Sequence, residues 1–306
     1  MATQAAVKQQ PAVTVDMALI SVALIWGINA SVIKSALVGW NELAFNALRF
    51  SAAAALLFLY VRFTDKDWRL SRADFWRVAV LGLVSNGLYQ WLYIEAVPRT
   101  SASNISVIIA MSPLLVTLWG MLTGIERRSG WVMAAAAASV TGVVMVILGE
   151  PGGMHLGGPN LKGDLIALGA MVCWASYTVY ARPVIDRVGS SLRVTAWAML
   201  FGAVSNMVIG IPGLLQQNFS VITATSVWGM VYSALGSLVY GYVVFAWGVG
   251  RIGGARTAIY TSLTPVFAAI IAGLFFNESW SLLQWTGAAI GVGGVALAKY
   301  QGAQGK

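Results

Sequence analysis

Large aromatic and amide side chains interrupt the apolar sequence between residues 86 and 93. Asn86, Tyr89, Gln90 and Tyr93 are spaced at i, i+3, i+4 and i+7, which places them on one face of a helix. Such groups can stack against an aromatic ring and can donate or accept hydrogen bonds, but they do not form a nucleophile–base pair. The chemistry that this face predicts is the non-covalent binding of a small molecule.

Similar side chains occur within several other apolar segments. Polar and aromatic groups at mid-depth in a membrane usually face neighbouring helices or a cavity, because facing lipid is costly. We therefore expect a cavity walled by Trp and Tyr, with amide and hydroxyl groups between them. The predicted substrate-binding residues are Trp26, Asn29, Asn86, Tyr89, Tyr93, Asn104, Trp174, Tyr177, Tyr240 and Tyr260.

Each of these residues also has an ordinary structural interpretation. Trp and Tyr anchor helix ends at the membrane–water interface, and a mid-helix ring can simply fill the space between helices. For Arg49, inside the second apolar segment, the expected partner is a helix end or a structural network rather than a substrate. Pro113 and Pro265 each remove a helical hydrogen bond inside a span, so they are predicted hinges.

Catalysis finds little support in the sequence. The sequence has one histidine, His155, and one cysteine, Cys173, which are too few for a metal site made of His and Cys ligands. It also has no phosphate-binding Gly-x-x-x-x-Gly-Lys-[Ser/Thr] loop. We therefore expect no enzyme activity, no cofactor, no metal site and no ATP-driven transport by this chain alone.

The composition is that of an integral membrane protein. Of 306 residues, 58% are hydrophobic and 10% are charged, and the mean hydropathy is +0.75, whereas soluble domains carry roughly a quarter charged residues. A bilayer core of about 30 Å requires about 20 apolar residues per helix. Uninterrupted apolar runs favour an all-α protein with ten transmembrane helices over a β-barrel. The predicted spans are 16–37, 43–62, 75–96, 100–121, 130–148, 162–182, 192–211, 226–248, 253–275 and 281–299.

The chain contains two diverged copies of one unit. Pro265 and Glu278 follow Pro113 and Glu126 at a spacing of 152 residues, as Arg251 follows Arg99. Each copy holds five helices, an odd number, so the second copy is inverted relative to the first. Inverted repeats are typical of carriers that work by alternating access around a site near mid-membrane. The predicted units are a tail (1–14), the first repeat (15–149), a Gly/Pro-rich linker (150–160), the second repeat (161–300) and a second tail (301–306).

Positive charge in the short loops predicts the orientation. With the N-terminus in the cytoplasm, 15 of the 19 Lys and Arg residues lie on the cytoplasmic side and three lie outside. Both termini are therefore expected in the cytoplasm. Because the basic residues gather in loops and not on one face, they do not indicate nucleic-acid binding.

The motifs resemble the EamA unit of the drug/metabolite transporter superfamily. The resemblance rests on Ser101-Ala-Ser-Asn, Met111-Ser-Pro and Glu126, on the second copy from Arg251 to Gly294, on Trp26-Gly27 and on Arg49. It covers both repeats and implies the EamA fold with a central cavity between them. Within the superfamily, the aromatic-rich third, sixth and eighth helices are similar to bacterial YddG-type exporters, which implies an inner-membrane carrier for aromatic amino acids.

Other functions fit the same composition. The main alternative is an exporter of multiple drugs or quaternary ammonium compounds such as methyl viologen, because Trp and Tyr bind cations. A nucleotide-sugar carrier would need basic groups at mid-depth, and a membrane scaffold would not need two matched halves. The expected partners are a small-molecule substrate and the lipid bilayer, and the chain is expected to be a monomer or a weak homodimer.

Overall fold

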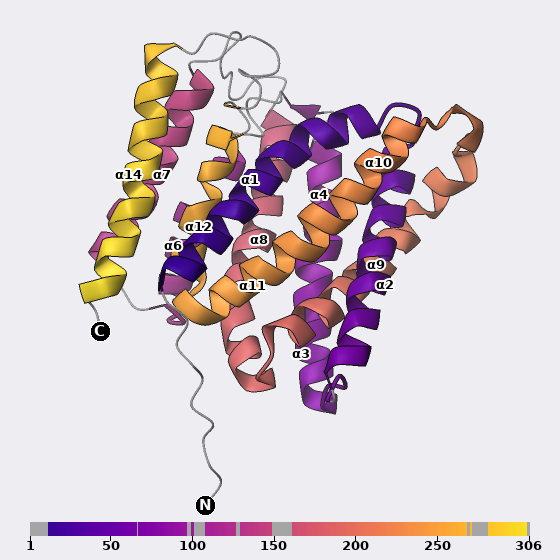
Figure 1. Cartoon of the computed structure of the whole chain (residues 1–306), viewed down its shortest axis with the longest axis horizontal. Helices are drawn as coiled ribbons and strands as arrows, with labels where there is room; N and C mark the ends of the chain where they lie inside the picture. Colours follow the sequence, from indigo (N-terminus) through magenta and orange to yellow (C-terminus); the bar gives the residue numbers. More distant parts are fainter. Residues whose placement is uncertain are drawn as a thin grey trace, which may run out of the picture.

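The computed structural model describes residues 12–65, 67–96, 99–100, 108–126, 129–148, 161–267, 270 and 281–304. Within these ranges all regular structure is helical (Figure 1). The predicted site residue Asn104 lies outside the described residues. The helices are α1 (Ala12–Ala36), α2 (Glu42–Thr64), α3 (Arg72–Gly82), η1 (Leu83–Leu88), α4 (Tyr89–Ala96), α6 (Ser112–Leu122), α7 (Gly130–Leu148), α8 (Leu161–Val188), α9 (Ser191–Gln216), η4 (Phe219–Val221), α10 (Ala224–Tyr232), η5 (Ser233–Tyr240), α11 (Gly241–Ile252), α12 (Gly254–Thr261) and α14 (Leu282–Gln304).

The helices follow the apolar segments of the sequence. Among the described residues, four helical stretches are long and apolar enough to cross a membrane: Glu42–Thr64, Leu161–Val188, Ser191–Gln216 and Ala224–Ile252. The first, fourth, fifth and tenth predicted spans contain shorter apolar helices. The all-helical fold and its membrane-spanning character therefore agree with the sequence analysis.

The third and eighth predicted spans each contain a π-helical segment, which the sequence analysis did not predict. The third span runs through α3, η1 and α4, and the eighth runs through α10, η5 and α11. The two π-helices begin at Leu83 and Ser233, so they lie at equivalent places in the two repeats. A π-helix widens the turn to i→i+5 hydrogen bonds and often occurs at functional sites.

Close helix packing holds the molecule together at its edges. Figure 1 shows α7 beside α14 at one edge, while α2 and α9 pack together near the other. Gly142 of α7 faces Gly287 and Gly291 of α14, and a Cβ atom on Gly142 would lie 2.3 Å from the backbone nitrogen of Gly291. The small residues therefore serve packing within the chain.

The two prolines expected to bend helices lie at helix starts instead. The helix before Pro113 ends at a turn at Met111, and Pro113 is in the first turn of α6. Pro265 lies in a helical segment (263–267) that follows a turn at Ser262. Proline fits this position because the N–H groups of a first turn have no partner within the helix. Each proline therefore follows a turn between two helices instead of bending one helix. A hinge function of Pro113 and Pro265 stays a prediction.

Candidate functional site

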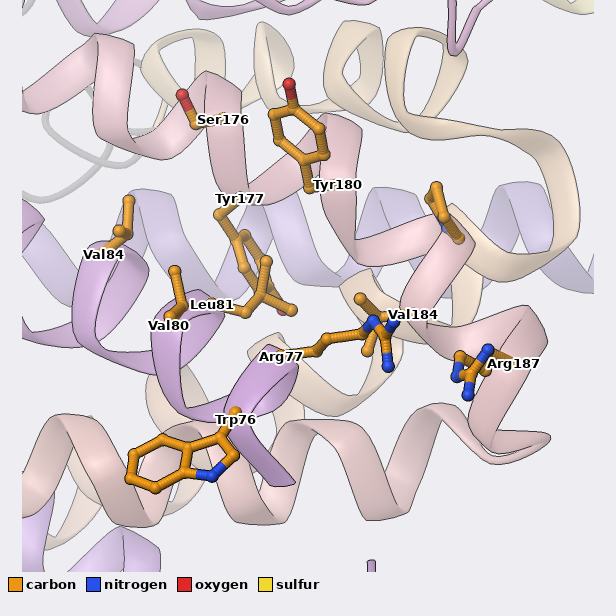
Figure 2. Close-up of a pocket in the computed structure, with 11 residues that line it drawn as sticks. Trp76, Arg77, Val80, Leu81, Val84, Ser176, Tyr177, Tyr180, Val184 and Arg187 are labelled. Atoms are coloured by element: carbon orange, nitrogen blue, oxygen red, sulfur yellow. The ribbon is translucent and has the colours of Figure 1, made fainter. Parts of the chain in front are cut away.

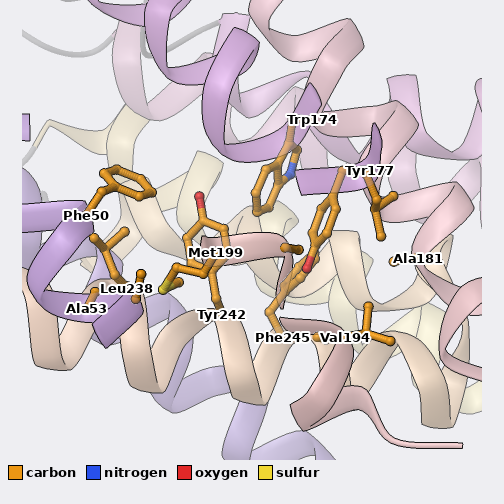
Figure 3. Packing of buried hydrophobic residues seen from close by; sticks show 14 of the residues in the cluster. Phe50, Ala53, Trp174, Tyr177, Ala181, Val194, Met199, Leu238, Tyr242 and Phe245 are labelled. Carbon is orange, nitrogen blue, oxygen red and sulfur yellow. The ribbon is translucent and has the colours of Figure 1, made fainter. Parts of the chain in front are cut away.

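Trp174 of α8 lies at the centre of a group of aromatic rings contributed by four helices. Its ring centroid is 5.9 Å from that of Trp26 on α1 and 5.6 Å from that of Tyr89 on α4. Phe245 of α11 is closer still, with its centroid at 5.2 Å. Figure 3 shows the rings from α8 and α11 turned toward one another. We define the aromatic cluster as Trp26, Tyr89, Tyr93, Trp174, Tyr177, Tyr242 and Phe245.

The π-helix η5 positions Trp26. The Nε1 group of Trp26 donates a hydrogen bond to the backbone carbonyl of Ser237 at 3.0 Å. Gly241, which follows η5, leaves room for the indole, because a Cβ atom there would lie 2.4 Å from Trp26 Nε1. The π-helix of the second repeat therefore positions the indole of Trp26, which belongs to the first repeat.

The members of the cluster differ in burial. Tyr177, Phe245 and Tyr242 have at most 5% of their surface exposed. Trp26, Tyr89 and Tyr93 are only half-buried, although Trp26 and Tyr89 pack against Trp174. Tyr89 and Tyr93 also stack on each other, with centroids 6.2 Å apart. The first-repeat side of the cluster thus keeps accessible aromatic surface.

A buried polar network lies beside the cluster. Arg49 of α2 donates from Nη2 to Asn46 Oδ1 at 2.7 Å and from Nη1 to Ser233 Oγ at 2.9 Å. Asn46 in turn donates to Asn206 of α9 at 3.0 Å, and Asn206 donates to the carbonyl oxygen of Asn86 at 2.6 Å. The network therefore connects η5 with η1 through Arg49, Asn46 and Asn206.

Several predicted site residues lie apart from the cluster. Tyr240 is 40% exposed and its hydroxyl lies 2.7 Å from Ser21 Oγ. Tyr260 donates to Asp16 Oδ1 at 2.5 Å and packs in a separate group of buried residues. Asn86 is buried against Gly202 of α9, so its side chain belongs to a helix contact. We leave Tyr240 and Tyr260 out of the site proposed below.

Asn29 and Gln90 are two further polar residues of the first repeat. Asn29 of α1 is 9% exposed, and its Oδ1 atom has no hydrogen-bond partner among the described residues. Gln90 of α4 is buried and hydrogen-bonds the Tyr242 hydroxyl. The face predicted on the third span thus separates into a helix contact at Asn86, a cross-repeat bond at Gln90 and the stacked pair Tyr89–Tyr93.

Sequence reasoning missed Tyr242 and Phe245, the two cluster members on α11. It selected Tyr240 because an uninterrupted α-helix places Ser233, Ser237 and Tyr240 on one face. The π-helix η5 changes that register and turns the next residues inward. The repeat itself carried the signal, because Tyr242 and Phe245 follow Gln90 and Tyr93 by the same 152 residues.

A groove of about 760 Å³ lies outside the cluster, between the third span and α8 (Figure 2). Its wall is largely apolar, and Tyr177 belongs both to this wall and to the aromatic cluster. At one end Asp74 accepts a 2.5 Å hydrogen bond from Arg187 and lies 3.6 Å from Arg77. Two cations therefore share one carboxylate at the end of the groove.

Glu126 joins the two halves at another place. Its Oε1 atom accepts hydrogen bonds from the backbone nitrogens of Gly254 at 2.7 Å and Ala255 at 3.3 Å, at the start of α12. A carboxylate at a helix N-terminus is favourable because it satisfies free N–H groups and the helix dipole. A polar pocket of about 550 Å³ beside it also contacts Arg182 and Arg256.

Comparison with known families decides the class of protein. A model of the EamA-like transporter family matches residues 13–148 and again residues 161–300. This chain belongs to the EamA-like transporter family. The two matches confirm the predicted membership of the drug/metabolite transporter superfamily. This EamA-like chain therefore belongs among membrane transporters and not among enzymes.

Curated relatives span nearly the whole EamA-like chain. An uncharacterized transporter of Archaeoglobus fulgidus is 26% identical over 278 residues, which cover 90% of this chain and 93% of the relative. A probable amino-acid metabolite efflux pump of Escherichia coli K12 is 22% identical over 276 residues, 88% of this chain and 89% of the relative. A crystal structure with 18% identity has a TM-score of 0.81 and covers 95% of this chain and 98% of its own, which supports the fold.

Proposed function

We propose that the chain exports aromatic and other apolar amino acids, and related metabolites, across the bacterial inner membrane by alternating access. One observation carries this proposal: the aromatic cluster is assembled from both repeats, with Trp174 between rings of α1, α4 and α11. Aromatic pairs prefer edge-to-face or offset contacts with centroids 4.5–7 Å apart. The half-buried rings of Trp26, Tyr89 and Tyr93 offer such contacts to a substrate ring.

The proposed mechanism requires ten spans in two inverted repeats of five helices. The packing of equivalent helices supports this arrangement: α2 contacts α9, α6 contacts α12, and α7 contacts α14. The equivalent π-helices η1 and η5 lie beside the cluster in the two halves. Two similar halves give two conformations of similar energy, one open to each side of the membrane.

The proposed orientation has both termini in the cytoplasm. The charge bias of the loops supports it. Figure 1 also places the start of α1 and the end of α14 toward the same end of the molecule. Under this orientation Trp174 is reached from the cytoplasm in one conformation and from outside in the other.

Transport by purified protein in lipid vesicles tests the proposal. We expect labelled phenylalanine to equilibrate across the vesicle membrane without an ion gradient, and threonine to move more slowly. Trp174→Ala should lower the rate of phenylalanine transport at least tenfold. It removes the ring that contacts aromatic residues of α1, α4, α8 and α11. The matched control is Trp228→Ala, which changes a tryptophan that is 71% exposed on α10 and should leave the rate unchanged.

Other outcomes separate the alternatives. Preferential uptake of methyl viologen over phenylalanine would contradict the proposal and favour the multidrug class. Uptake that begins only after a proton gradient is imposed would retain the substrate class and show a coupled carrier. If the purified protein elutes as a single species but transports none of these compounds, the result would contradict its role as a carrier.

A further inference from the structure

Arg49 is a buried cation without a counter-ion among the described residues. The side chain lies on α2 and is 6% exposed. Both of its hydrogen-bond partners, Asn46 and Ser233, are neutral. The Nε group is buried and has no hydrogen-bond partner in the part of the chain that the structure describes. The phenyl rings of Phe45 and Phe50 lie 5.8 Å and 5.3 Å from the guanidinium carbon, and they too are neutral.

The acidic groups near the spans are engaged elsewhere in the described part of the chain. Asp16 accepts from Tyr260, and Asp164 accepts from Thr100. Glu95 forms its ion pair with Arg99. A carboxylate that neutralises Arg49 is therefore missing from the described ranges, although burial of an unpaired charge is strongly unfavourable.

Arg49 faces the aromatic cluster. The phenol groups of Tyr89, Tyr93 and Tyr242 lie close enough to interact electrostatically with its guanidinium. Tyr89 and Tyr93 are the half-buried members of the cluster, and Tyr89 contacts Trp174. Phe50, whose ring lies against the guanidinium, belongs to the same buried group of residues as Trp174 and Tyr242. The guanidinium therefore lies beside the surface where the proposed substrate ring would bind.

We propose that Arg49 binds the carboxylate of the substrate, while the substrate's ring packs against Tyr89 and Trp174. A guanidinium group recognises a carboxylate through charge-assisted hydrogen bonds from a planar set of donors, and the free Nε group supplies one of them. The inference rests on the proposed function and narrows its substrate class to aromatic compounds that carry a carboxylate. Quaternary ammonium compounds are disfavoured at this site, because the buried cation repels them.

Ligand selectivity of the wild-type protein is the first test. Thermal stabilisation of the full-length protein in detergent would be measured with phenylalanine, 3-phenylpropionate, phenylalaninamide and phenethylamine. We expect the two carboxylates to bind at least tenfold more tightly than the two compounds without a carboxylate. Equal binding of all four would overturn the role of Arg49 and leave the proposed aromatic transport intact. Binding of none of them would count against the proposed function itself and against this inference with it.

Variants of α2 provide the second test. Arg49→Gln should bind phenylalanine and phenethylamine with similar affinity, whereas Arg49→Lys, which keeps the charge, should keep the carboxylate preference with weaker binding. Arg62→Gln is the matched control, because Arg62 is an exposed arginine on the same helix and should leave selectivity unchanged. A folded Arg49→Gln protein that keeps the carboxylate preference would overturn the inference. If Arg49→Gln fails to fold, the wild-type selectivity and Arg49→Lys decide the question.

Discussion

The third and eighth spans are built on the same plan but present different surfaces to the interior. Each begins with a hydroxyl cap, where Ser71 accepts from the nitrogen of Asp74 and Thr223 from that of Ser226. Each then passes through a π-helix. Past that point the third span presents half-buried Tyr89 and Tyr93, whereas the eighth presents the buried pair Tyr242 and Phe245.

This difference indicates a division of roles between the repeats. Burial of Tyr242 and Phe245 makes the eighth span a support for Trp174. The accessible rings of the third span form the surface that a substrate can contact. Duplication has thus kept the π-helix in both halves, while the side chains that follow it have diverged.

Truncation of one tyrosine from each span should separate the two roles most clearly. Tyr242→Ala empties a buried site and should lower the free energy of unfolding by about 3 kcal/mol. Tyr89→Ala should have a smaller effect on stability but reduce phenylalanine transport more than fivefold. Thermal unfolding in detergent and vesicle uptake would be measured on both variants. Equal effects on both readouts would contradict the division of roles.

Glycine has different importance in the two spans. Gly82 of α3 lies against α9, and a Cβ atom there would be 2.3 Å from the carbonyl oxygen of Ala198. Gly82→Ala should therefore destabilise the protein by about 2 kcal/mol, because the backbone of α9 must move. Gly236→Ala in η5 is the control, since its nearest neighbour is the Ile25 side chain at 3.5 Å. A comparable loss of melting temperature in both variants would show that the contact with α9 is not the cause.

The sequence predicted the all-helical, membrane-spanning character of the chain and much of the aromatic cluster because these depend on local pattern. Apolar runs of membrane length define helices, and an α-helical period brought Tyr89 together with Tyr93. The same period led to Tyr240, because a π-helix cannot be recognised from apolar residues alone and it rotates every side chain beyond it. The polar network around Arg49 was also beyond prediction, since Ser233 of η5 reaches Arg49, and Asn206 of α9 reaches Asn46, only through the packing of separate elements.

The hydrogen bond between Gln90 and Tyr242 connects the two spans directly. Gln90→Leu and Tyr242→Phe each remove one partner, so each should lower stability by about 1 kcal/mol. The double variant should be about as stable as either single variant, because the same bond is lost once. Unfolding measurements on all four proteins give the coupling energy, and simple additivity would contradict a direct bond.

The smallest difference lies at the start of the two spans. Asp74 occupies the position that Ser226 has in the eighth span, 152 residues later. The hydrogen bond from Ser71, followed by that from Arg187, lowers the pKa of Asp74 below its ordinary value of 3.8. Both bonds are 2.5 Å long, and the bond from Arg187 ties the exposed start of α3 to the end of α8. The eighth span has a neutral cap in the same place.

Asp74→Ser should convert the charged cap into the neutral one and remove its dependence on pH. A carboxyl group with a lowered pKa stabilises the folded state above its unfolded pKa, and this contribution disappears as the pH falls through the folded value. The difference in melting temperature between wild type and variant should therefore be constant near neutral pH. It should begin to shrink at about pH 3.8 and be lost once the pH is below the lowered pKa of Asp74 in the folded protein. Ser71→Ala removes the larger cause of the lowered pKa and keeps the Asp74 carboxyl group. In this variant the stabilising contribution of Asp74 should therefore be lost at a higher pH than in the wild-type protein. A difference that persists unchanged into acid would show that the ionised carboxylate does not stabilise this end of the third span.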